Sequence, residues 1–142
     1  MAQETPRGYF AQNIETVGYH DLNNKPAFKL AMQEVNNRWY LYLAHLWHRG
    51  WSILDVTDPT APEFCTFVPG PENTWTIQIQ VAEGKMITGL ERIAPGWGGT
   101  DGQSFAEGFF IFDVSAPNNG IVTADKGIDL TQRVVQQLKA GS

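Results

Sequence analysis

The chain has 142 residues, a length that allows one modest domain with a hydrophobic core. Hydrophobic residues make up 42% of the chain and aromatic residues 12%, which is typical of a folded protein and excludes general disorder. The formal net charge is −5 and no basic cluster stands out, so we expect neither nucleic acid nor an anionic membrane surface as a partner.

Three features of the sequence favour a cytoplasmic protein. The stretch MAQETPRGYF at 1–10 lacks the apolar run of a secretory signal. No stretch of eighteen apolar residues is present, so no membrane-spanning helix is expected. Cys65 is the only cysteine, so the sequence predicts neither a disulfide within the chain nor a cysteine-rich metal site.

Short apolar runs punctuated by glycine and proline predict an all-β chain. Tight turns are expected at Asn36–Asn37, because asparagine tolerates left-handed backbone, and at Glu83–Gly84. In chain order, the expected strands are residues 28–35, 39–45, 51–56, 63–68, 76–82, 85–91 and 109–114.

The sequence contains an internal repeat. WSILDVTDP at 51–59 matches FFIFDVSAP at 109–117, which places Asp55 and Asp113 58 positions apart, and a hairpin pattern precedes each copy. Four antiparallel strands repeated in this way are typical of a propeller blade of about 40–50 residues. We expect both aspartates to be structural, because a carboxylate at a strand end accepts hydrogen bonds from the turn that follows.

These repeated segments resemble the LVIVD-repeat family of bacterial β-propellers, whose apolar strands end in Asp-Val-Ser-x-Pro. The resemblance covers residues 28–117 and implies a partial β-propeller of four-stranded antiparallel blades. Members of the family are long enough to close a ring, whereas this chain holds about two blades. A naturally short form, a fragment of a longer propeller and the product of an altered reading frame remain open as explanations.

The end of the chain departs from the repeat. Asp129 followed by Gln132 is a capping-box-like start, and it predicts a short C-terminal helix over 129–139. We therefore expect an N-terminal extension over 1–27, two propeller-type blades over 28–120, and a non-repeat tail over 121–142. The helix would carry an apolar stripe formed by Leu130, Val134, Val135 and Leu138.

The most suggestive polar cluster is the loop after the second expected strand. It carries His45, His48 and Arg49, which suit a general base with an anion clamp, or metal ligands, or ordinary polar loop positions. An insertion at 92–108 stands at the equivalent place in the second unit, so both irregular segments are expected at the same end of the blades.

Acidic residues in and beside the insertion suggest calcium, which prefers oxygen ligands, although a glycine-rich loop with incidental acids is the alternative. The candidate metal ligands are Glu91, Asp101 and Glu107. By analogy with other propellers, these residues and His45, His48 and Arg49 would form the site of a calcium-dependent hydrolase of small esters or lactones.

A non-catalytic binding or assembly module is the alternative function. Propeller blades are common interaction platforms, and exposed tryptophans suit a peptide, a sugar or a partner subunit as ligand. The tryptophans in question are Trp39, Trp47, Trp51, Trp75 and Trp97.

Two blades leave two apolar faces open, since repeat units bury their faces only against neighbours. We therefore expect a homo-oligomer, preferably a trimer that closes a six-bladed ring, with a tetramer of eight blades as the variant. The competing expectation is that the tail helix covers one face within a monomer.

Overall fold

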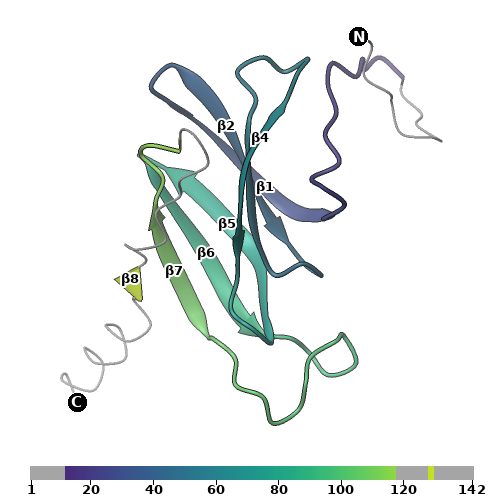
Figure 1. Cartoon of the computed structure of the whole chain (residues 1–142), viewed down its shortest axis with the longest axis vertical. Coiled ribbons are helices and arrows are strands. Elements are labelled where there is room, and N and C mark those ends of the chain that lie inside the picture. Colours follow the sequence, from purple (N-terminus) through teal and green to yellow (C-terminus); the bar gives the residue numbers. More distant parts are fainter. Residues whose placement is uncertain (1–11, 118–127, 130–142) are drawn as a thin grey trace.

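The structure of the chain is a computed structural model that describes residues 12–117 and 128–129 (Figure 1). Its strands form two antiparallel sheets, which confirms the predicted all-β class. The first sheet has the order β1 (Ala27–Val35), β2 (Arg38–His45), β3 (Gly50–Asp55) and β4 (Glu63–Pro69). The second sheet has the order β5 (Thr74–Ala82), β6 (Lys85–Arg92), β7 (Gly108–Asp113) and the two-residue β8 (Ile128–Asp129).

The C-terminal helix expected over 129–139 lies outside the described residues, apart from Asp129, which belongs to β8. Within the described parts of the chain there is no helix long and apolar enough to cross a membrane. Each expected strand from 28 to 114 has a counterpart whose bounds differ by one or two residues. The alternating apolar pattern therefore located the strands correctly.

Both hairpin turns have the left-handed backbone that their residues favour. Asn36 and Asn37 have φ values of 53° and 61°, and Glu83 and Gly84 have values of 49° and 71°. Two successive residues with positive φ fit the right-handed twist of a two-residue hairpin. The predicted turns are confirmed, and each sets the register of its sheet.

The repeated aspartates close the turn after the third strand of each sheet, as predicted. The amide of Thr57 donates to Asp55 Oδ1 at 2.9 Å, and the amide of Ser115 donates to Asp113 Oδ1 at 3.0 Å. Burial raises the pKa of Asp55, but the hydrogen bonds from Thr57 and the contact with Arg38, whose Nε lies 2.6 Å from Oδ2, outweigh it and lower the pKa. These contacts explain why the Asp-Val-Ser/Thr pattern recurs.

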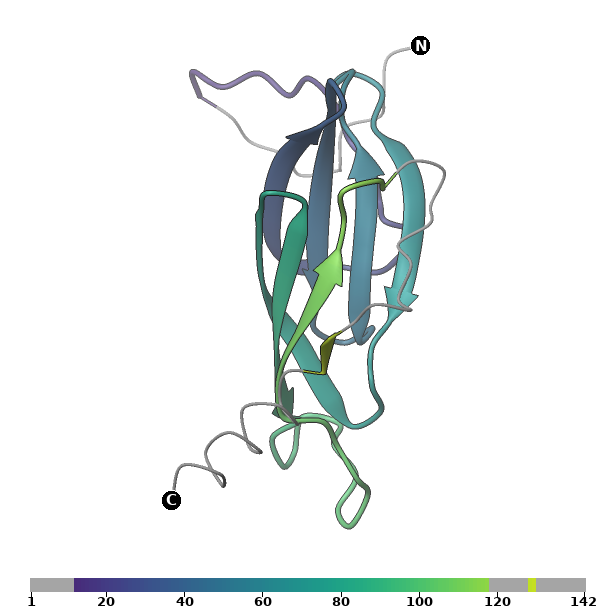
Figure 2. The same cartoon turned by 90° about the vertical axis from the view of Figure 1, so that its left-hand side faces the viewer.

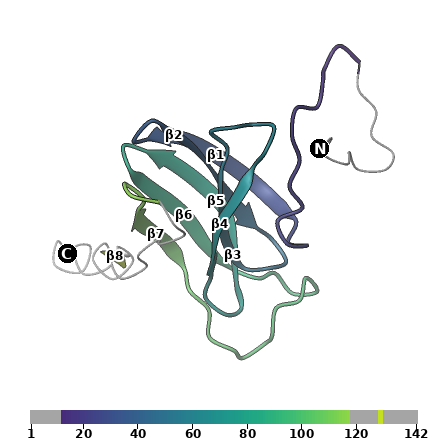
Figure 3. The ribbon, with the colours of Figure 1, turned by 45° about the horizontal axis from the view of Figure 1, so that its top comes forward.

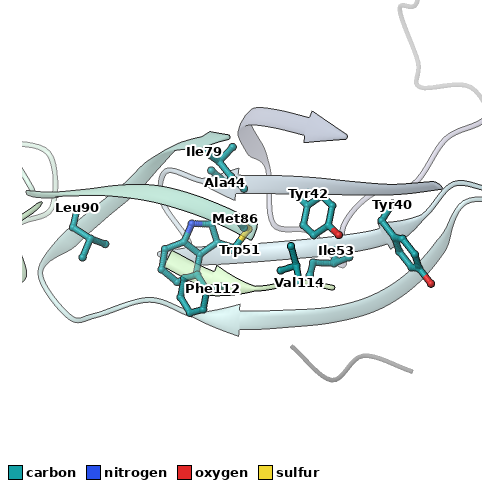
Figure 4. Close-up of a cluster of buried hydrophobic side chains, with 10 residues drawn as sticks. All are labelled: Tyr40, Tyr42, Ala44, Trp51, Ile53, Ile79, Met86, Leu90, Phe112 and Val114. Carbon is teal, nitrogen blue, oxygen red and sulfur yellow. The ribbon is translucent and has the colours of Figure 1, made fainter. Parts of the chain in front are cut away.

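The hydrophobic core lies between the two sheets, which pack face to face (Figure 2). Trp51 is at its centre, in contact with Phe110 and Phe112 of β7, and its Nε1 donates a 2.8 Å hydrogen bond to Thr88 Oγ1 on β6. Side chains from both sheets meet in this cluster (Figure 4). Its buried members are Tyr40, Tyr42, Ala44, Trp51, Ile53, Ile79, Met86, Leu90, Phe112 and Val114.

The segment before β1 lies on the side of the first sheet that faces away from the second sheet (Figure 3). Leu22 packs there against Leu43 and Leu54, and all three side chains are buried. The ring of His20 stacks on Phe64 of β4 with 6.0 Å between ring centroids. We call residues 14–26 the N-terminal strap.

Candidate functional site

A pocket of about 320 Å³ lies at one end of the two sheets, where the β2–β3 loop meets the insertion. The β2–β3 loop contributes Leu46, Trp47 and Arg49, and the insertion contributes residues from Ile93 to Gln103. The expectation that the two irregular segments lie at the same end is therefore confirmed. The linker between β4 and β5 contributes Glu72 and Asn73 to the wall of the pocket.

Three tryptophans converge on this pocket, which we call the tryptophan pocket. Trp47 and Trp97 stack with 5.8 Å between ring centroids and 10° between planes, although one belongs to each irregular segment. Trp75 on β5 meets Trp97 edge to face at 6.1 Å and 81°. The side chains of Trp47 and Trp97 remain 57% and 54% exposed, so their contact leaves ring surface open to solvent.

The insertion is held in place by Asn73. This residue is buried, has a φ of 53°, and uses both ends of its side-chain amide. Its Oδ1 accepts the amide of Thr100 at 2.8 Å, and its Nδ2 donates to the carbonyl oxygens of Thr100 and Gln103, each at 3.1 Å. Asparagine suits this position because it tolerates left-handed backbone and is both donor and acceptor.

The β2–β3 loop is fixed by Thr76, a buried residue of the second sheet. Its Oγ1 accepts the amide of Gly50 at 2.7 Å and donates to the carbonyl of His45 at 3.0 Å. Gly50 has a φ of 134°, and a Cβ there would lie 2.3 Å from the carbonyl oxygen of Val68. Only glycine fits this approach, so both sides of the pocket are anchored before any ligand arrives.

Polar groups of both kinds line the pocket beside the indoles. Glu72 Oε2 accepts a 2.8 Å hydrogen bond from Gln103 Nε2, which leaves Glu72 Oε1 and the side-chain oxygen of Gln103, Oε1, as acceptors for a ligand. Arg49 supplies donors from the opposite segment. The Nε1 of Trp75 is buried and has no hydrogen-bond partner among the described residues.

Of the predicted site residues, His45 lies in the interior. Its Nδ1 lies 3.0 Å from the carbonyl oxygen of Pro26 and its Nε2 lies 2.8 Å from Ser52 Oγ. Since a carbonyl oxygen only accepts, Nδ1 carries the proton and Nε2 accepts from the Ser52 hydroxyl. Burial lowers the pKa of His45. These contacts give His45 a structural role, and its side chain is closed to solvent.

The remaining predicted residues do not gather around one point. Arg49 lines the tryptophan pocket, whereas His48 is exposed and outside its lining. Glu91, Asp101 and Glu107 are exposed, and Asp101 forms an ion pair with Arg92 at 2.8 Å. Within residues 12–117 and 128–129, no three His, Cys, Asp or Glu side chains lie close enough to hold a metal ion.

Apart from Arg49, the polar groups of the pocket were not predicted from the sequence. Glu72, Asn73 and Gln103 occupy a linker and an insertion, where no period or motif singles them out. A usable signal did exist for the aromatic part, because Trp47 and Trp97 stand in irregular segments at equivalent places of the repeat. Tryptophan in two such loops indicates a shared surface better than the histidines do.

Comparison of the chain with models of protein families, with curated proteins and with solved structures found no match. The resemblance to the LVIVD-repeat propellers stays a prediction.

Proposed function

We propose that the chain is a non-catalytic binding module of the β-propeller type, and that its tryptophan pocket binds a saccharide. The observation that carries the proposal is the convergence of Trp47, Trp75 and Trp97, from three separate segments, on one polar-lined pocket. Pockets with aromatic walls and a few placed polar groups are the usual sites for small ligands.

The propeller architecture is supported by the way the two repeats pack. Each sheet has its strands in sequence order, as in a propeller blade, and the sheets lie face to face. Their first strands are neighbours, and Lys29 Nζ of β1 donates a 2.9 Å hydrogen bond to Gln78 Oε1 of β5. Successive blades around a common axis would bring their first strands together in the same manner.

The indoles suit one face of a pyranose ring. The ring face of tryptophan is apolar with a negative quadrupole, and it attracts the weakly positive C–H groups on the flat side of a sugar. Trp47 and Trp97 each leave more than half of the side chain exposed, and both are held by anchored segments. Such preorganisation reduces the entropy that binding costs.

The polar groups suit hydroxyls, which both donate and accept. Arg49 offers donors, Glu72 offers an acceptor, and Gln103 offers an acceptor on its amide. One positive and one negative side chain in the lining favour a neutral ligand over an anion or a cation. A ligand acceptor that reaches Trp75 Nε1 would also satisfy a buried donor that otherwise costs about 1–3 kcal/mol.

The calcium-dependent hydrolase predicted from the sequence stays a prediction, and the geometry of the described residues favours it less than binding. Its proposed base, His45, is engaged on both ring nitrogens inside the sheet. Its proposed acids Glu91, Asp101 and Glu107 are outside the lining of the pocket. A binding role uses the groups that the fold brings together.

The test is a titration of the protein with cello-, chito- and manno-oligosaccharides, followed by tryptophan fluorescence. We expect saturable binding of at least one of these probes. Trp97→Ala should weaken it at least tenfold, which is about 1.4 kcal/mol, while the control Trp39→Ala, an exposed indole outside the pocket, should retain affinity. Absence of binding to all three probes, or equal losses in both variants, would refute the proposal.

A further inference from the structure

The side of the first sheet that faces away from the second sheet carries large apolar side chains in the open. On β1, the side chains of Phe28, Leu30 and Met32 are 57%, 61% and 53% exposed. Leu30 and Met32 alternate with residues that face the second sheet, such as Lys29, so both lie on the side of the strand that faces away from it. Phe28 stands beside them, at an irregularity in the pairing of β1 with β2. We call this side the open face of the first sheet.

The equivalent side of the second sheet is covered. Leu30 and Ile79 hold the same place in the repeat. Across the first sheet, the β3 residue in line with Leu30 is Ser52, and across the second sheet the β7 residue in line with Ile79 is Phe110. Ser52 and Phe110 lie 58 positions apart, as the repeated aspartates do. Yet Ile79 is 2% exposed, since the first sheet packs on it. By register, the open face of the first sheet is therefore the counterpart of the face that the first sheet covers on the second.

The outer side of the second sheet is the complementary half. Ile87 is 40% exposed there, and with Phe109 and Gly89 it lines a shallow hollow of about 250 Å³. By register, Phe109 is the counterpart of Trp51, the residue that fills the interface between the sheets. We call this side the open face of the second sheet.

We propose that the open face of the first sheet docks on the open face of the second sheet of another copy of this chain. The occupant is a second copy because the two open faces are the two halves of an interface that the chain already forms once, between its own sheets. The contact is head-to-tail, and it builds a ring where the rotation closes. This interface is independent of the saccharide proposal.

The N-terminal strap limits this docking. Leu22 covers Leu43 and Leu54, which by register are the counterparts of Thr88 and Phe112, the residues that Trp51 contacts inside the chain. Leu22 thus fills the place that Phe109 of a second copy would take. Full docking requires the strap to move, so Leu22→Ala should strengthen association at least tenfold.

The test measures molar mass by sedimentation equilibrium on the full chain and on four variants, one of them Leu22→Ala, after circular dichroism has shown that each is folded. We expect the mass of the unmodified chain to rise above 15.8 kDa with concentration. Leu30→Glu and Ile87→Glu, which place a charge on opposite faces, should each remain at the mass of one chain. The matched control Ala61→Glu, at an exposed turn, should associate as the unmodified chain does.

Mixing the two single-face variants gives the sharpest readout. Each keeps one intact face, so an equimolar mixture should form a two-chain species and stop there. A symmetric contact between two copies of the first sheet would instead leave Ile87→Glu fully associated, which overturns the proposal. The proposal is also overturned if the mixture stays at the mass of one chain. It is overturned likewise if the unmodified chain and the Leu22→Ala variant both stay monomeric at about 1 mM, where even weak association would be seen.

Discussion

Leu30 and Ile79 occupy the same place in the two repeats, yet their side chains are 61% and 2% exposed. Both are aliphatic residues on first strands with the same pairing. The difference comes from the neighbour: the first sheet covers Ile79, and no described sheet covers Leu30. Burial in a repeat protein is therefore set by the adjacent unit as much as by the strand itself.

The two sheets also differ in the second residue of their third strand, β3 or β7. Trp51 reaches across the interface and donates to Thr88, while its counterpart Phe109 has no donor to offer. A hydrogen-bonded pair buried in an apolar interface favours one packing of the two sheets, because any other packing leaves the donor or the acceptor buried without a partner. The interface within the chain is therefore better specified than the contact proposed between chains.

The largest effect should separate the covered position from the open one. We expect Ile79→Ala to lower the free energy of unfolding by about 2–4 kcal/mol, because it leaves a cavity between the sheets. Leu30→Ala should lower it by less than about 0.5 kcal/mol in dilute protein, where its side chain already meets water. Urea unfolding measures both. Equal losses at the two positions would mean that the first sheet's outer side is covered in solution.

An intermediate effect should follow from loss of the Trp51 hydrogen bond. Trp51→Phe converts the first sheet to the residue type of the second, and should cost about 1–3 kcal/mol because it leaves the Thr88 hydroxyl buried without that donor. Adding Thr88→Val should recover part of the loss. If the two losses simply add in a double-mutant cycle, the hydrogen bond does not couple the sheets.

The smallest effect concerns pH and His45. Burial lowers its pKa in the folded chain below the ordinary value of about 6.5. As pH falls below about 6.5, the unfolded chain binds a proton that the folded chain does not, so stability decreases toward acid and is retained above that pH. Urea unfolding at pH 7.5 and 5.5 should show a larger decrease for the unmodified chain than for His45→Gln. An identical decrease in both would contradict the assigned burial.

The strands and turns were predictable from the sequence because their signals are local. The alternation in WYLYLAH and TIQIQVA, the paired asparagines and the repeated Asp-Val-Ser/Thr each specify a backbone conformation without reference to distant residues. The same alternation turns Tyr42 and Ala44 toward the core and so puts His45 on the other side of β2. Its burial there depends on the segment with Pro26, which no local pattern predicts.

The pocket was less predictable because it depends on contacts far apart in the chain. Asn73 reaches Thr100 and Gln103 over about thirty positions, and no local pattern announces such a bond. Trp47 and Trp97 meet because the two repeats pack face to face, which brings the β2–β3 loop beside the insertion. Of the histidines and charged residues predicted for the site, His48, Glu91, Asp101 and Glu107 are exposed and outside the lining of the pocket, whereas the indoles meet there.

The saccharide-binding claim is tested most directly by the five indole N–H resonances in an NMR titration with the same oligosaccharides. The account predicts that the signals of Trp47, Trp75 and Trp97 move together and saturate with one probe. The signals of Trp39, on the outer side of the first sheet, and of Trp51, in the core, should stay in place. Five unmoved signals with every probe, or a shift confined to Trp39, would contradict the account.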